Sequence, residues 1–165
     1  RDQSSSRGLG DVYKRQYRWS IGHKDRVPQR PLSCLELLEI TSQLDLDVLQ
    51  IADNMPIHTI ASETLEDLSK SANNLGINLE IGLQSFSTET TKEYLKIAER
   101  LNARILRIAL DGNDVQTSDD DIAKEFKKIL PIAEKIKCKI AIENHFAFPS
   151  TRTVSYTHLT LPTTR

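Results

Sequence analysis

Ile105-Leu106-Arg107-Ile108-Ala109-Leu110 is the stretch that decides the fold, because aliphatic residues alternate along it with small or polar ones. Leu106 and Ile108 share one face of a strand, and Arg107 and Ala109 share the other. An open parallel sheet buries both faces under helices, so its strands are apolar almost throughout. One aliphatic face and one small or polar face instead predict a strand of a closed barrel.

The same alternation recurs in four other short runs, and successive centres lie about thirty residues apart, the length of one strand and one helix. These predicted strands are 19–22, 48–52, 79–83 and 140–142. Their aliphatic face carries Trp19, Ile21, Leu49, Ile51, Leu79, Ile81, Ile140 and Ile142. Their opposite face carries Ser20, Gly22, Gln50, Ala52, Glu80, Gly82, Ala141 and Glu143.

Helices are predicted between the strands from their start and stop signals. Ser33 and Glu36 form a capping-box pattern, and three other residues can begin helices, namely Ser62, Ser87 and Ser118, the last with Asp121 and the acidic run 119–121. Gly76 suits a helix stop, and Pro131 is expected to kink the fourth helix. The expected buried residues are Leu35, Leu38, Leu65, Leu68, Ala72, Leu75, Tyr94, Leu95, Ala98, Leu101, Ile122, Phe126, Ile129, Ala133 and Ile136.

Strict alternation of strand and helix predicts a parallel sheet with right-handed crossovers. No glycine-rich phosphate loop follows the first predicted strand, which disfavours a dinucleotide-binding sheet. The predicted fold is therefore α/β, a partial (β/α)₈ TIM barrel of about five β/α units.

The two ends of the chain are unlike its middle. Asp11-Val12-Tyr13-Lys14-Arg15-Gln16 can be encoded by DNA whose reverse complement, in another frame, encodes Val154-Ser155-Tyr156-Thr157-His158. Protein physics does not select an inverted DNA repeat, and the pair resembles the mosaic end of a transposase used to prepare DNA for sequencing. We therefore expect residues 1–16 and 154–165 to be adapter-derived tails, and residues 17–153 to form the barrel domain.

Composition and charge exclude several functional classes. The chain has a net charge of −1, and its residues 17–153 carry 17 basic and 21 acidic side chains, a net charge of −4, which disfavours a nucleic-acid partner. No run approaches the roughly 18 apolar residues of a membrane helix, and the start does not read as a signal peptide. Cys34 and Cys138 lack a metal-binding or redox spacing, so we expect reduced thiols and a cytoplasmic protein.

In a barrel the active site lies at the carboxyl ends of the strands. The polar residues expected there are His23, Asp53, Asn54, Gln84, Ser85, Asp111, Glu143, Asn144 and His145. Glu143 and His145 point the same way along the last predicted strand, toward the mouth of the barrel. A carboxylate and an imidazole so placed can bind a divalent metal ion or move a proton, and a hydrogen-bonded core pair fits the pattern equally well.

Glu80 and Arg107 lie on adjacent predicted strands and face the lumen. We expect an ion pair between them, because either charge alone inside a barrel would be costly, and direct contact with substrate is the alternative. His23 and His58 lie in predicted loops, where most histidines are surface residues.

Cys138-Lys139-Ile140-Ala141-Ile142-Glu143-Asn144-His145 resembles the fifth strand of the xylose isomerase-like TIM barrel family, which includes sugar phosphate isomerases and epimerases. Further matches follow the chain order at Leu49-Gln50-Ile51-Ala52-Asp53-Asn54, Leu79-Glu80-Ile81-Gly82 and Ile105-Leu106-Arg107. The resemblance covers nearly all of residues 17–153 and says little about the substrate.

The resemblance implies that Glu143 is a metal ligand that can also act as acid or base, and that His145 contacts substrate or metal-bound water. It implies a divalent metal ion (Mn, Mg, Co or Zn) whose other ligands lie on later strands that we expect to be missing. The implied chemistry is proton transfer next to the carbonyl of a sugar or sugar phosphate, polarised by the metal. The substrate-binding candidates are His23, Asn54, Gln84 and Arg107.

Alternative functions remain open on the same scaffold. An apurinic-endonuclease-type metallohydrolase would need histidine ligands where this sequence has Asp53-Asn54 and Gln84-Ser85. A metal-dependent lyase or dehydratase is a further possibility. Because five of eight strands cannot close a barrel, we also expect that the chain as written has no activity and that the parent protein is the isomerase or epimerase.

Overall fold

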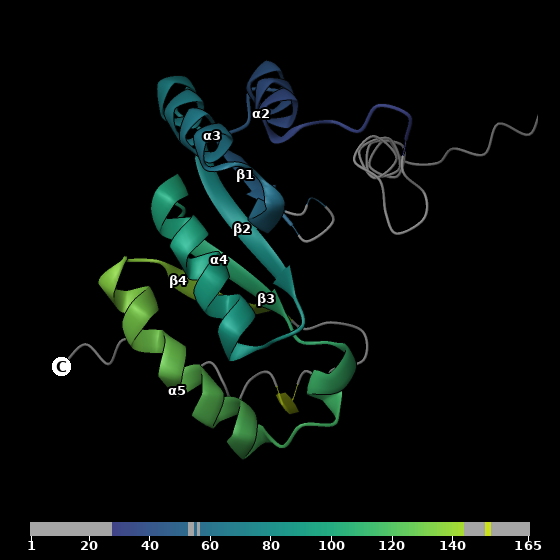
Figure 1. Cartoon of the computed structure of the whole chain (residues 1–165), viewed down its shortest axis with the longest axis vertical. Helices are drawn as coiled ribbons and strands as arrows, with labels where there is room; N and C mark the ends of the chain where they lie inside the picture. The colour runs from purple at the N-terminus through teal and green to yellow at the C-terminus, as the bar shows by residue number, and fades with distance from the viewer. Residues whose placement is uncertain (1–27, 53–54, 56, 144–150, 153–165) are drawn as a thin grey trace, which may run out of the picture.

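A computed structural model describes residues 28–52, 55, 57–143 and 151–152 of the chain. Figure 1 shows helices and strands alternating along this part of the chain. The elements in order are α2 (Cys34–Gln43), β1 (Val48–Ile51), η1 (Ile57–Thr59), α3 (Ser62–Leu75), β2 (Asn78–Gln84), α4 (Thr88–Leu101), β3 (Ile105–Ala109), η2 (Gly112–Val115), α5 (Asp119–Lys135) and β4 (Lys139–Glu143). The predicted strand 19–22 and both predicted tails lie outside the described residues.

The four strands form one parallel sheet in the order β1-β2-β3-β4. Each strand therefore pairs with the next strand in sequence, as successive units of a barrel do. Neighbouring helices pack against one another along the sheet, α2 on α3, α3 on α4 and α4 on α5. Within the described residues, β1 and β4 are the edge strands.

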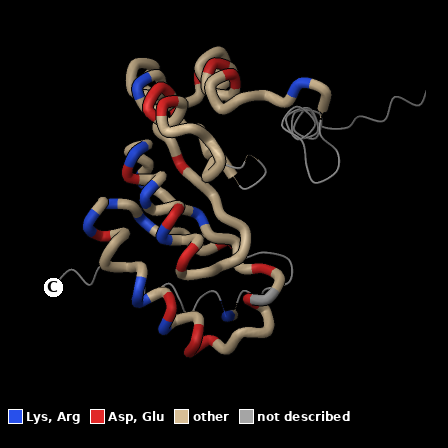
Figure 2. Tube along the Cα trace, viewed as in Figure 1, with Lys and Arg blue, Asp and Glu red and all other residues tan. Residues whose placement is uncertain are grey.

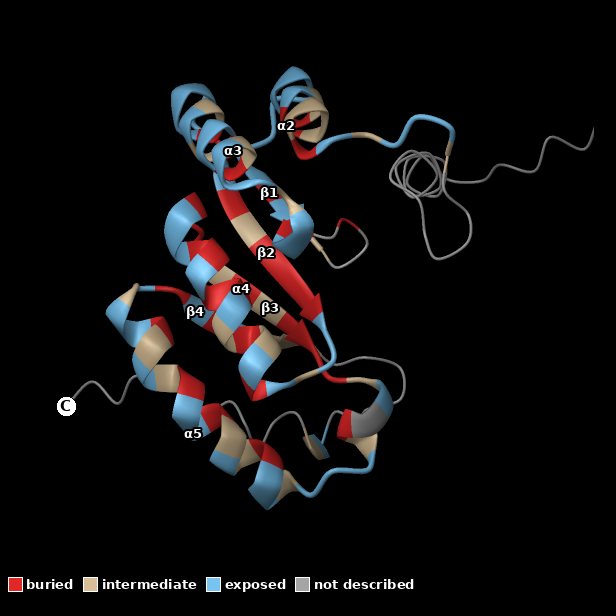
Figure 3. Ribbon diagram, in the orientation of Figure 1, coloured by how far each residue is buried: buried red, intermediate tan, exposed pale blue. Residues whose placement is uncertain are grey.

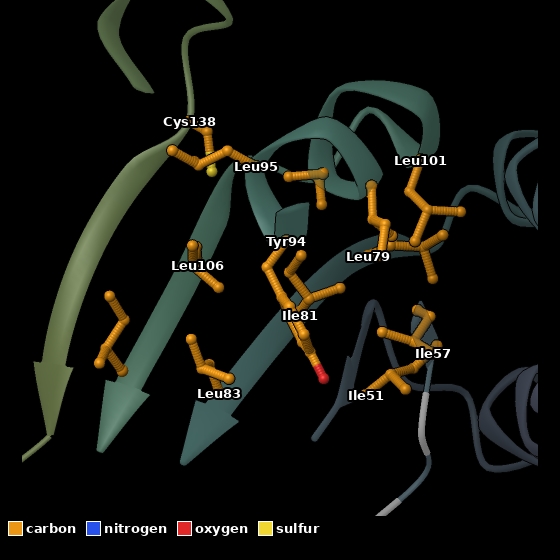
Figure 4. Close-up of a cluster of buried hydrophobic side chains, with 14 of the residues drawn as sticks. Ile51, Ile57, Leu79, Ile81, Leu83, Tyr94, Leu95, Leu101, Leu106 and Cys138 are labelled. Carbon is orange, nitrogen blue, oxygen red and sulfur yellow. The ribbon is translucent and has the colours of Figure 1, made fainter. Parts of the chain in front are cut away.

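One face of the sheet is buried under the helices, and we call it the outer face. Its aliphatic side chains are nearly inaccessible to solvent, and they include Ile81 on β2 and Leu106 and Ile108 on β3. Figure 4 shows Leu79, Ile81, Leu83 and Leu106 of the sheet lying with Tyr94, Leu95 and Leu101 of α4 in this core. The predicted aliphatic face is therefore the face that the helices cover.

The opposite face, which we call the inner face, is more accessible. Gln50 and Ala141 are exposed, and Glu80, Arg107 and Glu143 are half-buried. Figure 3 shows that exposed residues lie mainly along the helices, while much of β2 and β3 is buried. Charged residues lie mainly along the helices, with both signs interspersed (Figure 2).

Helix starts follow the predicted capping signals in three of four cases. Ser33 and Glu36 form a reciprocal capping box at α2, because each side chain bonds the backbone N–H of the other residue. Ser87 accepts from the N–H of Thr90 at the start of α4, and Ser118 accepts from the N–H of Asp121 at the start of α5. Asp119, Asp120 and Asp121 occupy the first turn of α5, as predicted.

Two predictions about α3 are wrong. Ala61 is the N-cap, and no side chain caps the helix; the Ser62 hydroxyl instead accepts a hydrogen bond from Arg100 of α4 at 3.0 Å. Leu75 is 47% exposed because it is the last residue of α3, just before the left-handed turn at Gly76, and Ile77 beyond the turn is buried in its place. The predicted stop at Gly76 is confirmed by its φ of 71°.

The fourth predicted helix is α5, and it contains the predicted proline. α5 continues through Pro131, so the expected kink stays a prediction, and Ile136 is only half-buried because it lies just beyond the helix as its C-cap. Cys34 and Cys138 are free thiols, as predicted, and both are buried. Burial raises the pKa of the Cys138 thiol to about 11.

Within the described ranges, no helix combines the length and the apolar character needed to cross a membrane.

Candidate functional site

Polar side chains gather on the inner face toward the carboxyl ends of the strands, and the strand register sets their levels. Gln50 lies opposite Glu80 at the lowest level. Arg107 lies in the middle, between Gly82 and Ala141. Ala109 lies between Gln84 and Glu143 at the rim. We call these three levels the inner-face ladder.

Arg107 and Glu143 form an ion pair across β3 and β4, from Nη1 to Oε2. The side chain of Arg107 is 24% exposed and that of Glu143 is 36% exposed, so the pair is partly accessible from the rim. Glu143 therefore lies on the inner face at the end of its strand, where the sequence placed it, with its carboxylate held by a guanidinium.

The predicted ion pair between Glu80 and Arg107 is wrong. Glu80 Oε2 instead accepts a hydrogen bond of 2.9 Å from Gln50 Nε2. Glu80 and Glu143 lie on the neighbouring strands, one level below and one level above Arg107, and the guanidinium binds the higher of the two carboxylates. The long Arg107 side chain then reaches over the glycine and up to the rim.

Gln84 and Asp111 meet at the ends of β2 and β3. Gln84 Nε2 donates to Asp111 Oδ2 at 3.0 Å, and the other carboxylate oxygen accepts from the N–H of Gly112 at 2.8 Å. Ser85 adopts a left-handed φ of 63° and donates to the Asp111 carbonyl at 3.5 Å. These exposed polar groups can bind hydroxyl groups of a small molecule.

Asp114 joins the two loops that carry these residues. Its buried Oδ2 accepts from the N–H groups of Phe86 and Asp111, each at 2.9 Å. The Phe86 ring stacks on Phe126 of α5 with centroids 4.2 Å apart. Sequence reasoning missed Asp114, and its only signal was an acidic residue in a short turn after a strand, a common local pattern.

Arg152 is a second residue that sequence reasoning missed. Its guanidinium donates to the Asp119 carboxylate at 2.5 Å and to the carbonyls of Val115 and Thr117 at 2.9 and 2.5 Å. The chain after β4 therefore returns to the connection between η2 and α5. No pattern in the sequence indicated this long-range contact.

Three predicted site residues, His23, Asn54 and His145, lie outside the described residues, as do Asp53 and Asn144. The structure thus brings together Arg107 and Glu143 and places Gln84 at the same rim. His58 is an exposed residue of η1, as predicted, and its Nδ1 lies 3.2 Å from the Tyr94 hydroxyl.

Solved structures share this arrangement of strands and helices. The crystal structure of D-psicose 3-epimerase in the presence of D-fructose matches with a TM-score of 0.64 at 16% identity, over 77% of this chain and 54% of that chain. A xylose isomerase domain protein from Planctomyces limnophilus matches with a TM-score of 0.58 at 11% identity, over 76% of this chain and 55% of that chain. The fold is that of the xylose isomerase-like TIM barrels. The predicted partial barrel and the predicted resemblance are thus confirmed for the fold.

One curated protein is similar in sequence. The chain is 28% identical to the 3-oxo-isoapionate decarboxylase of Pectobacterium atrosepticum over 120 residues, which are 73% of this chain and 43% of that protein. No family model matches the chain. The chain spans about half the length of the proteins that it matches.

Proposed function

We propose that the chain is part of an enzyme that moves a proton at the carbon next to the carbonyl of a sugar or sugar phosphate. The observation that carries the proposal is the place of Glu143, whose partly exposed carboxylate lies on the inner face at the carboxyl end of β4. In barrels of this kind, chemistry occurs at that end of the strands. The likeness in fold to a protein named D-psicose 3-epimerase supports the same class of reaction.

Three residues of the inner-face ladder have distinct parts in the proposed reaction. Glu143 takes or returns the proton, because a carboxylate within hydrogen-bond reach can act as a general base or acid. Arg107 orients that carboxylate through the ion pair. Gln84 offers a side-chain amide at the same rim for a sugar hydroxyl. His23, Asn54 and His145 keep their predicted contacts with the substrate as proposals.

The predicted divalent metal ion needs several ligands, and the described residues supply only one of those predicted. Within them, no group of three histidine, cysteine or acidic side chains could hold a metal ion. Glu143 is the single predicted ligand among them, and a guanidinium binds its carboxylate. These residues do not by themselves fit a metal site, so the metal stays a prediction and no step of the proposed reaction is assigned to it.

A second candidate function is decarboxylation of a 3-oxo sugar acid. The similarity to a protein named 3-oxo-isoapionate decarboxylase favours it, because that reaction also leaves an electron pair on the carbon next to a carbonyl. The bond from this carbon to the carboxylate breaks, carbon dioxide leaves, the carbonyl takes up the electron pair, and a proton then adds to the carbon. In this second candidate, Glu143 supplies the proton from the carboxyl end of β4.

Isotope exchange separates the two candidates. The protein from the parent gene, and the chain 1–165 beside it, are incubated in D₂O with D-fructose or D-psicose, and deuterium at carbon 3 is followed by NMR. We expect exchange with the parent protein and a loss of about 100-fold or more in its Glu143→Gln variant. Carbon dioxide release from a 3-oxo sugar acid, without exchange into the ketoses, would favour the second candidate.

Glu80→Gln is the matched control. It makes the same chemical change on the same face, but Glu80 lies at the lowest level of the inner-face ladder and bonds Gln50. We expect its exchange rate to stay near that of the wild type. Equal losses in the two variants, or no loss in Glu143→Gln, would contradict the assignment of Glu143.

A further inference from the structure

The space beside Gly82 is occupied by the side chain of Arg107. A Cβ atom at this position would lie 2.9 Å from Arg107 Nη2, 3.0 Å from Arg107 Nε and 3.3 Å from Arg107 Cζ. Only Gly76 and Gly112 among the described glycines have a positive φ, so the backbone at Gly82 accepts a side chain. The guanidinium occupies the space that a side chain at Gly82 would need.

The inner-face ladder explains why the guanidinium lies there. Arg107 has small neighbours on both sides at its own level, Gly82 on β2 and Ala141 on β4. Its side chain can therefore lie over Gly82 while Nη1 reaches Glu143 one level higher. Gly82 is buried although it lies on the accessible inner face, which agrees with a cover formed by the guanidinium.

The Nε atom of Arg107 adds a second observation about the same packing. This atom is buried and makes no hydrogen bond to any group in the described part of the chain. A guanidinium that was free to choose its place would turn this donor toward water or toward an acceptor. The packing against Gly82 and the bond to Glu143 therefore determine the position of the side chain.

We propose that Gly82 and Arg107 act as one positioning unit, in which the absence of a side chain at Gly82 lets Arg107 hold the Glu143 carboxylate at the rim. The effect of this unit on turnover rests on the proposed function. Its effect on the Arg107 and Glu143 side chains rests on the geometry alone, and the two can be measured separately.

The first experiment uses NMR on the ¹⁵N-labelled chain 1–165. The Arg107 Nε–H signal is assigned by its loss in Arg107→Lys, and its exchange with water is measured. We expect slow exchange in the wild type and at least about tenfold faster exchange in Gly82→Ala and in Glu143→Gln, because both changes release the guanidinium. Fast exchange in the wild type, or no change in Gly82→Ala, would overturn the proposal.

The second experiment is a double-mutant cycle in urea unfolding with Gly82→Ala and Arg107→Ala. We expect the added methyl group to lower the unfolding midpoint when Arg107 is present and to have no such effect when residue 107 is alanine. Equal shifts in both backgrounds would show that Gly82 acts independently of Arg107. If Gly82→Ala does not fold, Gly82→Ser gives a second substituent at the same place.

Turnover provides the third readout, on the parent protein in the exchange assay. We expect Gly82→Ala to lower kcat by up to about 100-fold with little change in KM, since a displaced catalytic group can cost this much. An unchanged kcat in an active enzyme would refute the positioning role. If the wild type shows no exchange, the proposed function fails, and the NMR and unfolding results still decide whether the unit exists.

Discussion

The two faces of the sheet differ in what they contribute to the protein. On the outer face, Ile81 and Leu106 are completely buried under α4, and apolar burial there holds the strands and helices together. On the inner face, Arg107 and Glu143 sit on strands adjacent in the same sheet, half-accessible and joined as an ion pair. One backbone thus carries the apolar core on one side and the proposed reactive groups on the other, because strand residues alternate between faces.

The inner face also changes in chemical character along the strands. From the lowest level to the rim it passes from the Gln50–Glu80 pair, through Arg107 over Gly82, to Gln84 and Glu143. At the rim, Gln84 bonds Asp111 in the loop after β3, whereas Glu143 is held by Arg107 of β3 itself. This gradient suggests where a substitution affects stability and where it affects activity.

The largest expected effect on unfolding free energy comes from truncating a side chain in the core under the outer face of the sheet. Phe126 is fully buried on α5, and Phe126→Ala is expected to lower the unfolding free energy by about 3–5 kcal/mol, because a cavity is left behind. Gln50→Ala on the inner face is expected to cost at most about 1 kcal/mol. Urea unfolding monitored by circular dichroism measures both, and similar losses would remove the distinction between the faces.

An intermediate effect is expected at Asp114, below the rim. Asp114→Ala leaves the N–H groups of Phe86 and Asp111 without their acceptor, and we expect a loss of about 2 kcal/mol in unfolding free energy. Asp114→Asn keeps an oxygen in the same place and is expected to lose less. Urea unfolding of the two variants checks this order, and an equal loss in both would mean that the charge, not the two hydrogen bonds, matters.

The smallest expected effect on stability concerns the N-terminal cap of α2. The backbone N–H and the hydroxyl of Ser33 donate hydrogen bonds to the Glu36 carboxylate, and Arg30 donates another. These bonds lower the pKa of the Glu36 carboxyl below its usual value of 4.5. A lowered native pKa stabilises the fold above about pH 4.5, and this stabilisation is lost as the pH falls through the native pKa. The difference in unfolding midpoint between wild type and Glu36→Gln should therefore shrink as the pH falls below about 4.5.

Glu39 is an exposed residue of the same helix, and Glu39→Gln serves as the control because it removes one charge from α2 without changing the cap. A midpoint difference for Glu36→Gln that stays constant from pH 7 to pH 3 would show that the cap does not depend on ionisation of Glu36.

Much of the fold could be predicted from local sequence patterns. Period-two alternation identified β1 to β4 and their buried face, and short polar signals identified the starts of α2, α4 and α5. These patterns work because strand alternation and helix capping depend on residues within a few positions of one another. Ser62 failed as a cap because a distant residue, Arg100, binds its hydroxyl.

The candidate site was predictable only in part. Glu143 and Gln84 were assigned to the rim because the carboxyl ends of parallel strands share one edge of the sheet. The partner of Arg107 was assigned wrongly, because neighbouring strands on both sides offer a carboxylate one level away, and the sequence does not specify which of them the guanidinium binds. Asp114 and Arg152 bind groups far away in the sequence, so no local pattern indicated them.

The sequence by itself therefore determined which segments become strands and helices, and which strand face turns to the helices. Only the tertiary structure decided that Arg107 lies over Gly82 and holds Glu143, and that Asp114 ties two loops together. The physical reason is that secondary structure and burial follow from spacing along the chain. Side-chain partners follow from strand register and loop packing, which arise only when distant segments meet.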